Sequence, residues 1–482
     1  MPAACFILSG ADTGTMEGRD PVLEAIAGTA GDRSAGIDRQ HWHEGVTAYA
    51  VRSAEGDALQ FSLPVILRRP LLSEIPLDPR GSAGVVALLI ERIKQKAAGD
   101  PALGSLAAKG TRFPGKYAAN IEPYTLVGSP DALASDLWHA DMRNFADADG
   151  VHLLLRGVVP FPATISPEAI ARVAETSAAL LAGVQKIVFA FPARALEDAW
   201  IGALDQELLR ERLPDLGLVA FVGDTTRFAR ACTQYRCYSR TAGPKSGTNI
   251  PFTCPPELDP VEIELPAGNR IVTGLGIHRR EIFSVAGSNA QGKTTFLEGI
   301  LAGVDTHAAG DGRELAVTVP GVRTAEAMNC ELGGTDISMF FSALPPGIGG
   351  TVTSAYGMGS GSMTMAAQVQ QAIARSAPLL IIDEDRAAPN LLVKSCLQRD
   401  EVTPLSAILA EDRGRMGDTT LLFAACAMDT LIAEADRIMV LDRHVASGLD
   451  PKMFRKRVAE MARRVAERME DEQGTRACRE CR

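Results

Sequence analysis

Long apolar runs are missing from this sequence, and so is a basic start. The longest nearly unbroken apolar stretches, residues 84–90 and 421–428, fall well short of the roughly 20 residues that a membrane helix needs. Residues 1–8 lack the positive charge that begins a secretory signal. These absences argue against a membrane-spanning helix, so we expect a cytoplasmic protein with no membrane partner.

Cysteine pairs and net positive charge are scarce as well. The nine cysteines contain one C-x-x-C, Cys478 and Cys481, with no second pair or histidine nearby. Neither a disulfide framework nor a zinc module is therefore expected. The formal net charge is −10, so non-specific affinity for nucleic acid would have to come from a local basic patch.

A glycine-bearing loop follows an apolar stretch in the second half of the chain. The run 281–286 leads through this loop to Lys293 and Thr294, which fits the pattern G-x-x-x-x-G-K-[ST]. Backbone N–H groups of such a loop, at the start of the next helix, bind phosphate oxygens. Lys293 would bring a positive charge to the outer phosphates, and Thr294 would ligate Mg²⁺. The residues predicted to bind ATP are Gly287, Ser288, Asn289, Ala290, Gln291, Gly292, Lys293, Thr294 and Thr295.

A second element, residues 379–384, strengthens the prediction of an ATP site. Its apolar residues 379–382 predict a buried strand, and Asp383 at the tip can hold Mg²⁺ through water. Glu384 is placed to orient or deprotonate an attacking water and is the predicted catalytic residue. The plainer alternatives are a simple glycine turn and a strand with a solvated acidic end, but the chain order of the two elements favours ATP and Mg²⁺.

The region before residue 235 has a mixed texture. The stretch 233–249 is rich in Gly, Ser, Thr and Pro and is taken as a boundary or a long exposed loop. Upstream of it, β-like runs alternate with helical patterns, which predicts an N-terminal α+β domain over residues 1–235. The first ~40 residues are Gly- and Asp-rich and are expected to be flexible. The β-like runs are 151–158, 186–191 and 217–222, and the helical patterns are 167–181 and 195–212.

Residues 236–450 read as a P-loop ATPase domain of the α/β class, because strands and helices alternate in the expected order. The predicted strands are 281–286, 377–382, 419–425 and 436–441, and the predicted helix is 292–302.

The last segment, residues 451–482, is predicted to be a basic amphipathic helix. Apolar residues such as Val458, Met461 and Val465 recur at helical spacing among many Lys and Arg residues. One interpretation is a terminal helix that docks its apolar stripe on the domain and leaves a solvated charged face. The other is a contact with nucleic acid or a protein partner.

A third motif lies between the two ATP elements, where residues 357–368 pass from a Gly/Ser turn into a helix. Here the chain resembles the ABC class of P-loop ATPases, in which a Ser-Gly signature opens a helix before the Asp-Glu strand. It is similar to a small soluble ABC-class family with members in bacteria and archaea and one member associated with RNA editing in kinetoplastid mitochondria. The stretches that carry this resemblance, which covers roughly residues 215–445, are 217–224, 250–252, 274–277, 310–314, 359–368 and 382–390.

The resemblance implies more than the residues alone do. It implies a homodimer that sandwiches two ATP molecules, in which Ser360, Gly361 and Ser362 act in trans on the γ-phosphate of the opposite subunit. It also implies that the N-terminal domain binds nucleic acid, RNA in particular. A C-terminal basic helix is the other expected site for RNA or DNA.

The chain departs from the family pattern at three positions that matter for chemistry. Ala427 stands where most ABC ATPases carry a His that holds the γ-phosphate, and Arg386 and Pro389 replace Thr in the loop that should meet the other subunit. Phosphoryl transfer depends mainly on positioned charge, so we expect slow ATP hydrolysis rather than none. The alternative is an ATP-gated binding scaffold with little or no hydrolysis, and a phosphotransferase is a weaker third reading.

Overall fold

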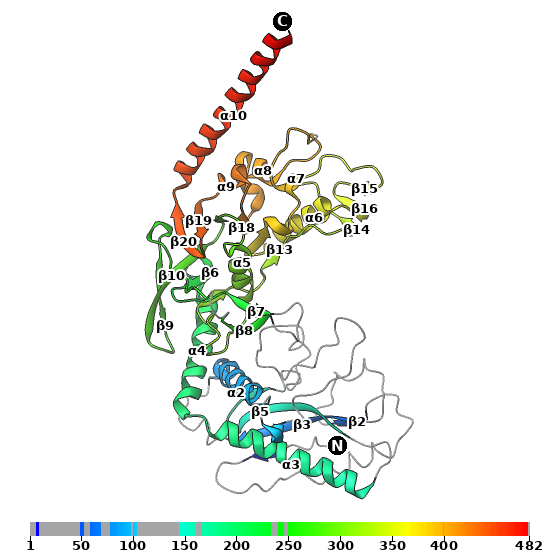
Figure 1. The fold of residues 1–482 in the computed structure, drawn as a ribbon, viewed down its shortest axis with the longest axis vertical. Helices are drawn as coiled ribbons and strands as arrows, with labels where there is room; N and C mark the ends of the chain where they lie inside the picture. The colour runs from blue at the N-terminus through cyan, green and yellow to red at the C-terminus, as the bar shows by residue number, and fades with distance from the viewer. Residues whose placement is uncertain are drawn as a thin grey trace.

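The computed structural model describes residues 6–8, 49–52, 58–68, 78–97, 100–103, 144–160, 166–232, 240–244, 249–398 and 400–480. Except for a strand at residues 6–8, the predicted flexible start therefore lies outside the described residues, as do most of the stretch 233–249 and Cys481. The N-terminal elements occupy one end of the molecule and the phosphate-loop elements lie toward the other (Figure 1).

The N-terminal part is built on a five-stranded mixed sheet. Its order is β1-β3-β5-β4. On the same side of the sheet path, β1 pairs with residues 65–67 of β3, and β2 pairs with residues 59–62 of β3. The two long strands run antiparallel from Ala58 opposite Pro160 to Arg68 opposite Gly150. The strands are β1 (Phe6–Leu8), β2 (Tyr49–Arg52), β3 (Ala58–Arg68), β4 (Phe145–Ala146) and β5 (Gly150–Pro160).

Helices pack against this sheet and share its core. Along α2, Val85, Leu89 and Ile93 recur every four residues, so one face is apolar and is buried with Val65 and Leu153 of the sheet. The elements are η3 (Pro79–Gly81), α2 (Ser82–Ala97), η4 (Pro101–Leu103), α3 (Pro167–Phe189) and α4 (Ala193–Arg212). The strands and helices together form the α+β arrangement that was predicted for this part of the chain.

The predicted strand at residues 186–191 is wrong, because α3 continues through it to Phe189. Leu181, Val184 and Val188 are all buried, and their spacing of three and four residues places them on one helical face. A short apolar run reads alike as a strand or as the end of a buried helix, which explains the error. The predicted strands at 151–158 and 217–222 are confirmed by β5 and by β6 (Leu218–Gly223).

The phosphate-loop part contains a six-stranded sheet of order β13-β17-β18-β11-β19-β20. Its strands pair in parallel except for β20, which runs antiparallel to β19. The strands are β11 (Ile282–Ala286), β13 (Arg323–Thr324), β17 (Leu379–Asp383), β18 (Thr420–Ala425), β19 (Arg437–Asp442) and β20 (Val445–Leu449). The strands predicted at 281–286, 377–382, 419–425 and 436–441 are therefore confirmed within two residues at their ends.

A four-stranded antiparallel sheet of order β12-β6-β10-β9 shares a core with the parallel sheet. Phe221 of β6, Phe283 of β11 and Ile300 of the phosphate-loop helix α5 (Lys293–Ala302) are all buried in it. Because β6 precedes residue 235 but pairs with β10, the proposed limit between residues 235 and 236 falls after a strand of this sheet, and the domain limits stay a prediction. The remaining strands are β9 (Val261–Leu265), β10 (Arg270–His278) and β12 (Ala316–Thr318).

A third unit carries the Gly/Ser motif. The small sheet β14-β16-β15 packs beside α6, and the helices that follow β17 complete the same core. Its elements are β14 (Cys330–Thr335), β15 (Gly349–Thr351), β16 (Ser354–Gly359), α6 (Gly361–Ala374), η8 (Glu384–Arg386), α7 (Pro389–Leu392), α8 (Leu405–Glu411), η9 (Arg413–Met416) and α9 (Asp429–Ile432). The hairpin β7 (Arg230–Cys232) and β8 (Arg240–Pro244) and the turn η7 (Pro256–Leu258) complete the fold.

The last helix, α10 (Pro451–Glu480), projects away from the rest of the protein (Figure 1). Phe454 packs against the core at its base, and Arg455 donates to the carbonyl of Ala433 at 2.6 Å. Met461 and Val465 are exposed further along. A C-terminal helix with many basic residues is therefore present, and its apolar side chains contact the body at Phe454 but are exposed at Met461 and Val465.

No single helix among the described residues is long and apolar enough to cross a membrane. The pair α3 and α4 passes such a test only when the two are joined across their 81° bend, and both helices bury apolar side chains in the core.

Candidate functional site

The glycine-bearing loop lies between β11 and α5 and has the backbone that its sequence requires. Gly287 has φ 139°, and a Cβ there would lie 2.4 Å from the carbonyl oxygen of Leu441. Gly292, the N-cap residue of α5, has φ 100°. Only glycine adopts both conformations without strain, so these two residues fix the loop at the mouth of the helix.

Lys293 lies over this loop with its side chain folded back. Its Nζ donates to the carbonyl oxygens of Gly287 at 2.8 Å and Ser288 at 2.9 Å. The residue is 9% exposed, and these two contacts hold its positively charged ammonium group against the backbone of the loop. A phosphate that entered the loop would offer this ammonium a charged acceptor in place of two carbonyls.

Thr294 and Asp383 meet as the sequence suggested. The Thr294 hydroxyl donates to Asp383 Oδ2 at 2.6 Å, although 89 residues separate them in the chain. Asp383 Oδ1 accepts from the backbone N–H of Asp385 at 3.3 Å, which fixes the carboxylate at the tip of β17. The two oxygen groups are of the kind that Mg²⁺ prefers, and phosphate and water would supply the remaining ligands. No group of three or more His, Cys, Asp or Glu residues able to hold a metal occurs in the described part of the chain.

Glu384 is bound to the end of the neighbouring strand β18. Its Oε2 accepts from the backbone N–H of Cys426 and, at 3.4 Å, from that of Ala427. The position that lacks the expected His therefore contributes a backbone N–H to the carboxylate. The structure thus brings Lys293, which follows β11, and Asp383 and Glu384, at the end of β17, to the same carboxyl edge of the sheet, with β18 between the two strands.

The Gly/Ser motif lies apart from the pocket beside the loop. Ser360 is the N-cap residue of α6, and its carbonyl accepts from the N–H of Thr364 at 3.0 Å. The Ser362 hydroxyl donates to Asn390 Oδ1 at 2.9 Å, so the motif and the loop after Glu384 are linked within one chain. Ser360, Gly361 and Ser362 do not line the pocket described next.

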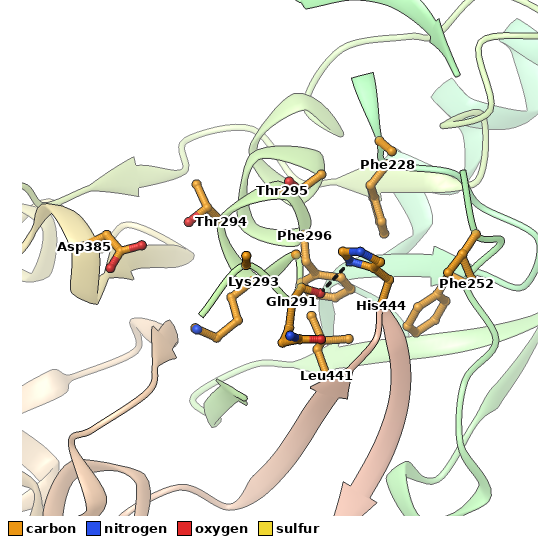
Figure 2. A pocket seen from close by; sticks show the side chains of 14 residues that line it. Phe228, Phe252, Gln291, Lys293, Thr294, Thr295, Phe296, Asp385, Leu441 and His444 are labelled. Atoms are coloured by element: carbon orange, nitrogen blue, oxygen red, sulfur yellow. Dashed lines mark hydrogen bonds between the residues drawn. The ribbon is translucent and has the colours of Figure 1, made fainter. Parts of the chain in front are cut away.

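A cavity of about 310 Å³ adjoins the loop and has an aromatic side (Figure 2). Phe228 and Phe296 meet edge to face with ring centroids 5.2 Å apart, and Phe252 lies 5.9 Å from Phe296. His444, in the turn between β19 and β20, also lines the cavity, and its Nδ1 lies 3.0 Å from the carbonyl oxygen of Gln291. The full lining is Phe228, Ala229, Ile250, Phe252, Ala290, Gln291, Gly292, Lys293, Thr294, Thr295, Phe296, Asp385, Leu441 and His444.

The sequence did not reveal this aromatic side. The sequence has no aromatic residue between Phe252 and Phe283, and the rings come from Phe228, Phe252 and Phe296. Phe252 was part of the stretch 250–252 that resembles the family, which was the available signal. Nothing in the local sequence marked Phe228 or His444.

Comparison with known proteins agrees with this geometry. The ABC_ATPase family model, a P-loop domain, matches residues 192–479. The chain belongs to the ABC_ATPase family. The predicted family is therefore confirmed, and so is the α/β P-loop fold class. As an ABC_ATPase, the chain carries a nucleotide-binding P-loop domain, of a family that generally uses ATP and Mg²⁺.

Individual relatives add little about function. The chain is 38% identical over 409 residues to the uncharacterized protein MJ1628 of Methanocaldococcus jannaschii, which covers 84% of this chain and 89% of the relative. Among solved structures, a chain described as an inward-facing metal-chelate type ABC transporter shares 14% identity. That match covers 40% of this chain and 81% of the other, with a TM-score of 0.26, which is too low to bear on function.

Proposed function

We propose that this ABC_ATPase binds ATP with Mg²⁺, hydrolyses it slowly and works as a nucleotide-gated homodimer. The observation that carries the proposal is the hydrogen bond from Thr294 to Asp383, with Lys293 and Glu384 on either side. This set supplies charge for the phosphates, oxygens for the metal and a carboxylate for water.

Each residue has a role that follows from its place. Lys293 leaves the two loop carbonyls and pairs with the outer phosphates. Thr294 and Asp383 hold Mg²⁺, which when bound neutralises phosphate charge. Glu384 orients the attacking water, and the backbone N–H groups of Cys426 and Ala427 hold its carboxylate at the strand end.

The aromatic cavity receives the base in this proposal. A flat ring system can stack on Phe228 or Phe252, and the cavity is continuous with the residues that bind phosphate, since Gly292, Lys293 and Thr294 line it too. Replacing Phe252 by Ala should weaken ATP binding more than it weakens binding of tripolyphosphate, because only ATP carries a base. Isothermal titration calorimetry with the two ligands measures the difference.

The catalytic assignment is tested by phosphate release. Wild type and Glu384→Gln are compared at saturating ATP and Mg²⁺, with Lys293→Ala as a variant that should fail to bind. We expect Glu384→Gln to retain ATP and to lose roughly 100- to 10,000-fold in rate, the usual size of a general-base effect. Equal rates for wild type and Glu384→Gln would refute the role of Glu384.

An ATP-gated scaffold with little hydrolysis is the second candidate. It is favoured by Ala427, whose methyl group cannot hydrogen-bond to the γ-phosphate. It is also favoured by the hydrogen bonds that Glu384 accepts from two backbone N–H groups. A scaffold would bind ATP and dimerise without releasing phosphate above background. Sedimentation of wild type with ATP, ADP and no nucleotide separates the two, because slow hydrolysis makes the ATP-induced dimer decay and a scaffold keeps it.

The dimer in this proposal places Ser360, Gly361 and Ser362 of one copy on the γ-phosphate of the other. Small residues at the N-terminus of α6 leave backbone N–H groups free to contact phosphate. Ser360→Arg should block ATP-induced dimerisation while leaving ATP binding to the monomer intact.

Nucleic acid, RNA in particular, is the proposed cargo, bound by the N-terminal domain or by α10. Lys452, Arg457 and Arg464 are among the exposed basic side chains that support α10 as the contact. Binding of RNA and DNA is measured at several salt concentrations with and without ATP. A steep salt slope that disappears on deleting residues 451–482 supports α10, and an unchanged slope moves the contact elsewhere.

A further inference from the structure

Arg386, one of the residues by which this chain departs from its family, makes contacts that the proposed chemistry does not use. It is the last residue of η8, the single turn that begins at Glu384. Its Nη1 lies 3.0 Å from Glu326 Oε1 and its Nη2 lies 3.2 Å from Glu298 Oε1. Its carbonyl oxygen also accepts from the backbone N–H of Ala327 at 2.8 Å. One guanidinium therefore joins carboxylates from two separate segments.

The first carboxylate belongs to the phosphate-loop helix. Glu298 lies on α5 four residues after Thr294, which is about one helical turn. An ion pair from Arg386 to Glu298 thus fixes η8 against the helix that holds the Mg²⁺-binding hydroxyl. The distance between Glu384 and Thr294 depends in part on this pair.

The second carboxylate belongs to a segment that is bound to the signature helix. The side-chain amide of Gln368, on α6, accepts from the N–H of Glu326 at 2.8 Å and donates to its carbonyl at 3.2 Å. Thr364, one turn after Ser360, contacts both backbone groups of Met328. Residues 326–328 are therefore hydrogen-bonded to α6, and Glu326 links them to Arg386.

Charge explains why an arginine suits this place. Three carboxylates act on this guanidinium: the hydrogen bond with Glu326 chiefly, and then the negative charges of Glu326, Glu298 and Asp383, raise the pKa of Arg386 above its usual value. A planar guanidinium can engage two carboxylates in different directions, which the ammonium of a lysine cannot do with the same geometry. The Arg386 side chain is 49% exposed, so its pairs stabilise the fold little and act mainly on geometry.

We propose that Arg386 is a positioning residue that sets Glu384 according to the relative placement of the phosphate-loop helix and the signature helix. The inference rests on the proposed role of Glu384 in hydrolysis. In it, Arg386 touches neither ATP nor water. Movement of α6 changes the Glu326 contact, the turn η8 shifts with it, and the carboxylate of Glu384 moves into or out of line.

Arg386→Gln is the main perturbation, and Arg413→Gln is the matched control. Arg413 is 45% exposed and also uses its guanidinium on a carboxylate from another segment, that of Asp436, but it makes no contact with the site. We expect Arg386→Gln to lower kcat between roughly 10- and 100-fold, the effect of a small misplacement, and to leave KM nearly unchanged. Arg413→Gln should keep the kcat of wild type.

A double-mutant cycle shows whether Glu326 is the route. Glu326→Gln alone should lower kcat, and the double variant should lose no more than Arg386→Gln alone, because the pair acts as a unit. Arg386→Lys should recover only part of the rate. Additive losses, or a wild-type kcat in both Arg386→Gln and Glu326→Gln, would overturn the proposal.

Backbone hydrogen exchange gives a second measurement that does not require hydrolysis. Peptides that cover residues 326–328 and 384–386 should exchange faster in Arg386→Gln and in Glu326→Gln than in wild type, and at the wild-type rate in Arg413→Gln. If wild type releases no phosphate, the proposed function fails, and the exchange result alone then decides whether Arg386 ties these segments together. Unchanged exchange in both site variants would refute the tie itself.

Discussion

Replacing Gly299 by alanine tests the packing on the aromatic side of the cavity beside the glycine loop. Gly299 lies on α5, and a Cβ there would come within 2.0 Å of Phe228 Cδ1 and 2.3 Å of Cε1. Real Cβ atoms do not approach other atoms so closely, so the ring must move. The same ring contacts Phe296 edge to face at 5.2 Å, and that contact would be lost or distorted.

The net effect is worked from opposing contributions. Alanine in place of glycine inside a helix stabilises by about 1 kcal/mol. Overpacking costs about 1–3 kcal/mol, and a lost aromatic pair costs about 0.5–1.5 kcal/mol. We expect Gly299→Ala to lower the free energy of unfolding by about 0.5–3.5 kcal/mol, since the contributions that oppose folding are larger.

Gly202 provides the control, because it lies inside α4 and a Cβ there would meet nothing within 4 Å. Gly202→Ala should therefore stabilise by about 0.5–1 kcal/mol. Urea unfolding midpoints measure both changes, and calorimetry with ATP measures whether the displaced Phe228 ring also weakens nucleotide binding. If Gly299→Ala is stabilised as much as Gly202→Ala, the packing argument and the description of the cavity are wrong.

Three further outcomes are expected. Gly287→Ala should abolish ATP binding, because its φ of 139° and a Cβ 2.4 Å from the carbonyl oxygen of Leu441 are incompatible with the loop; fluorescence of a labelled nucleotide reports it. Burial is the main cause that raises the pKa of Asp205 above its usual value. The native state therefore keeps this proton to higher pH than the unfolded state does, and stability is lost as pH rises through the native pKa. Asp205→Asn should remove this loss in urea titrations from acid to neutral pH. Burial raises the pKa of Cys254 from 9.0 to about 11, so iodoacetamide at pH 8 should label exposed Cys426 and spare Cys254 by mass spectrometry, and stability should fall as pH rises from 9 to 11.

The sequence predicted the strand, the glycine loop and the helix around Lys293 well, because these elements are local. A strand, a glycine loop and a helix follow one another at residues 281–302, and each is marked by its own pattern. Asp383 and Glu384 stand at the end of a short apolar run, which together with the preceding glycine loop favoured a buried strand. The contact between Thr294 and Asp383 then follows from parallel strands whose carboxyl ends share one edge.

Contacts between segments far apart in the chain could not be predicted from the sequence. Phe228 and His444 reach the cavity from segments more than 200 residues apart, and neither carries a local signal. The same holds for β6, whose partners β10 and β12 lie far along the chain. The error at residues 186–191 has another cause. A short apolar run has the same pattern whether it forms a strand or the end of a buried helix, and only the packing around it decides between the two.

The turn between β19 and β20 connects the surroundings of Gln291 to α10 through one short strand. Arg443 and His444 both have positive φ, at 48° and 66°, and both contact Gln291 beside the site where phosphate would sit. From this turn a single short strand leads to the 30 residues of α10, a rod of about 45 Å. A tilt of about 5° at the base of α10 would move its far tip by about 4 Å. A small movement of the β19–β20 hairpin would therefore be amplified at the end of the helix.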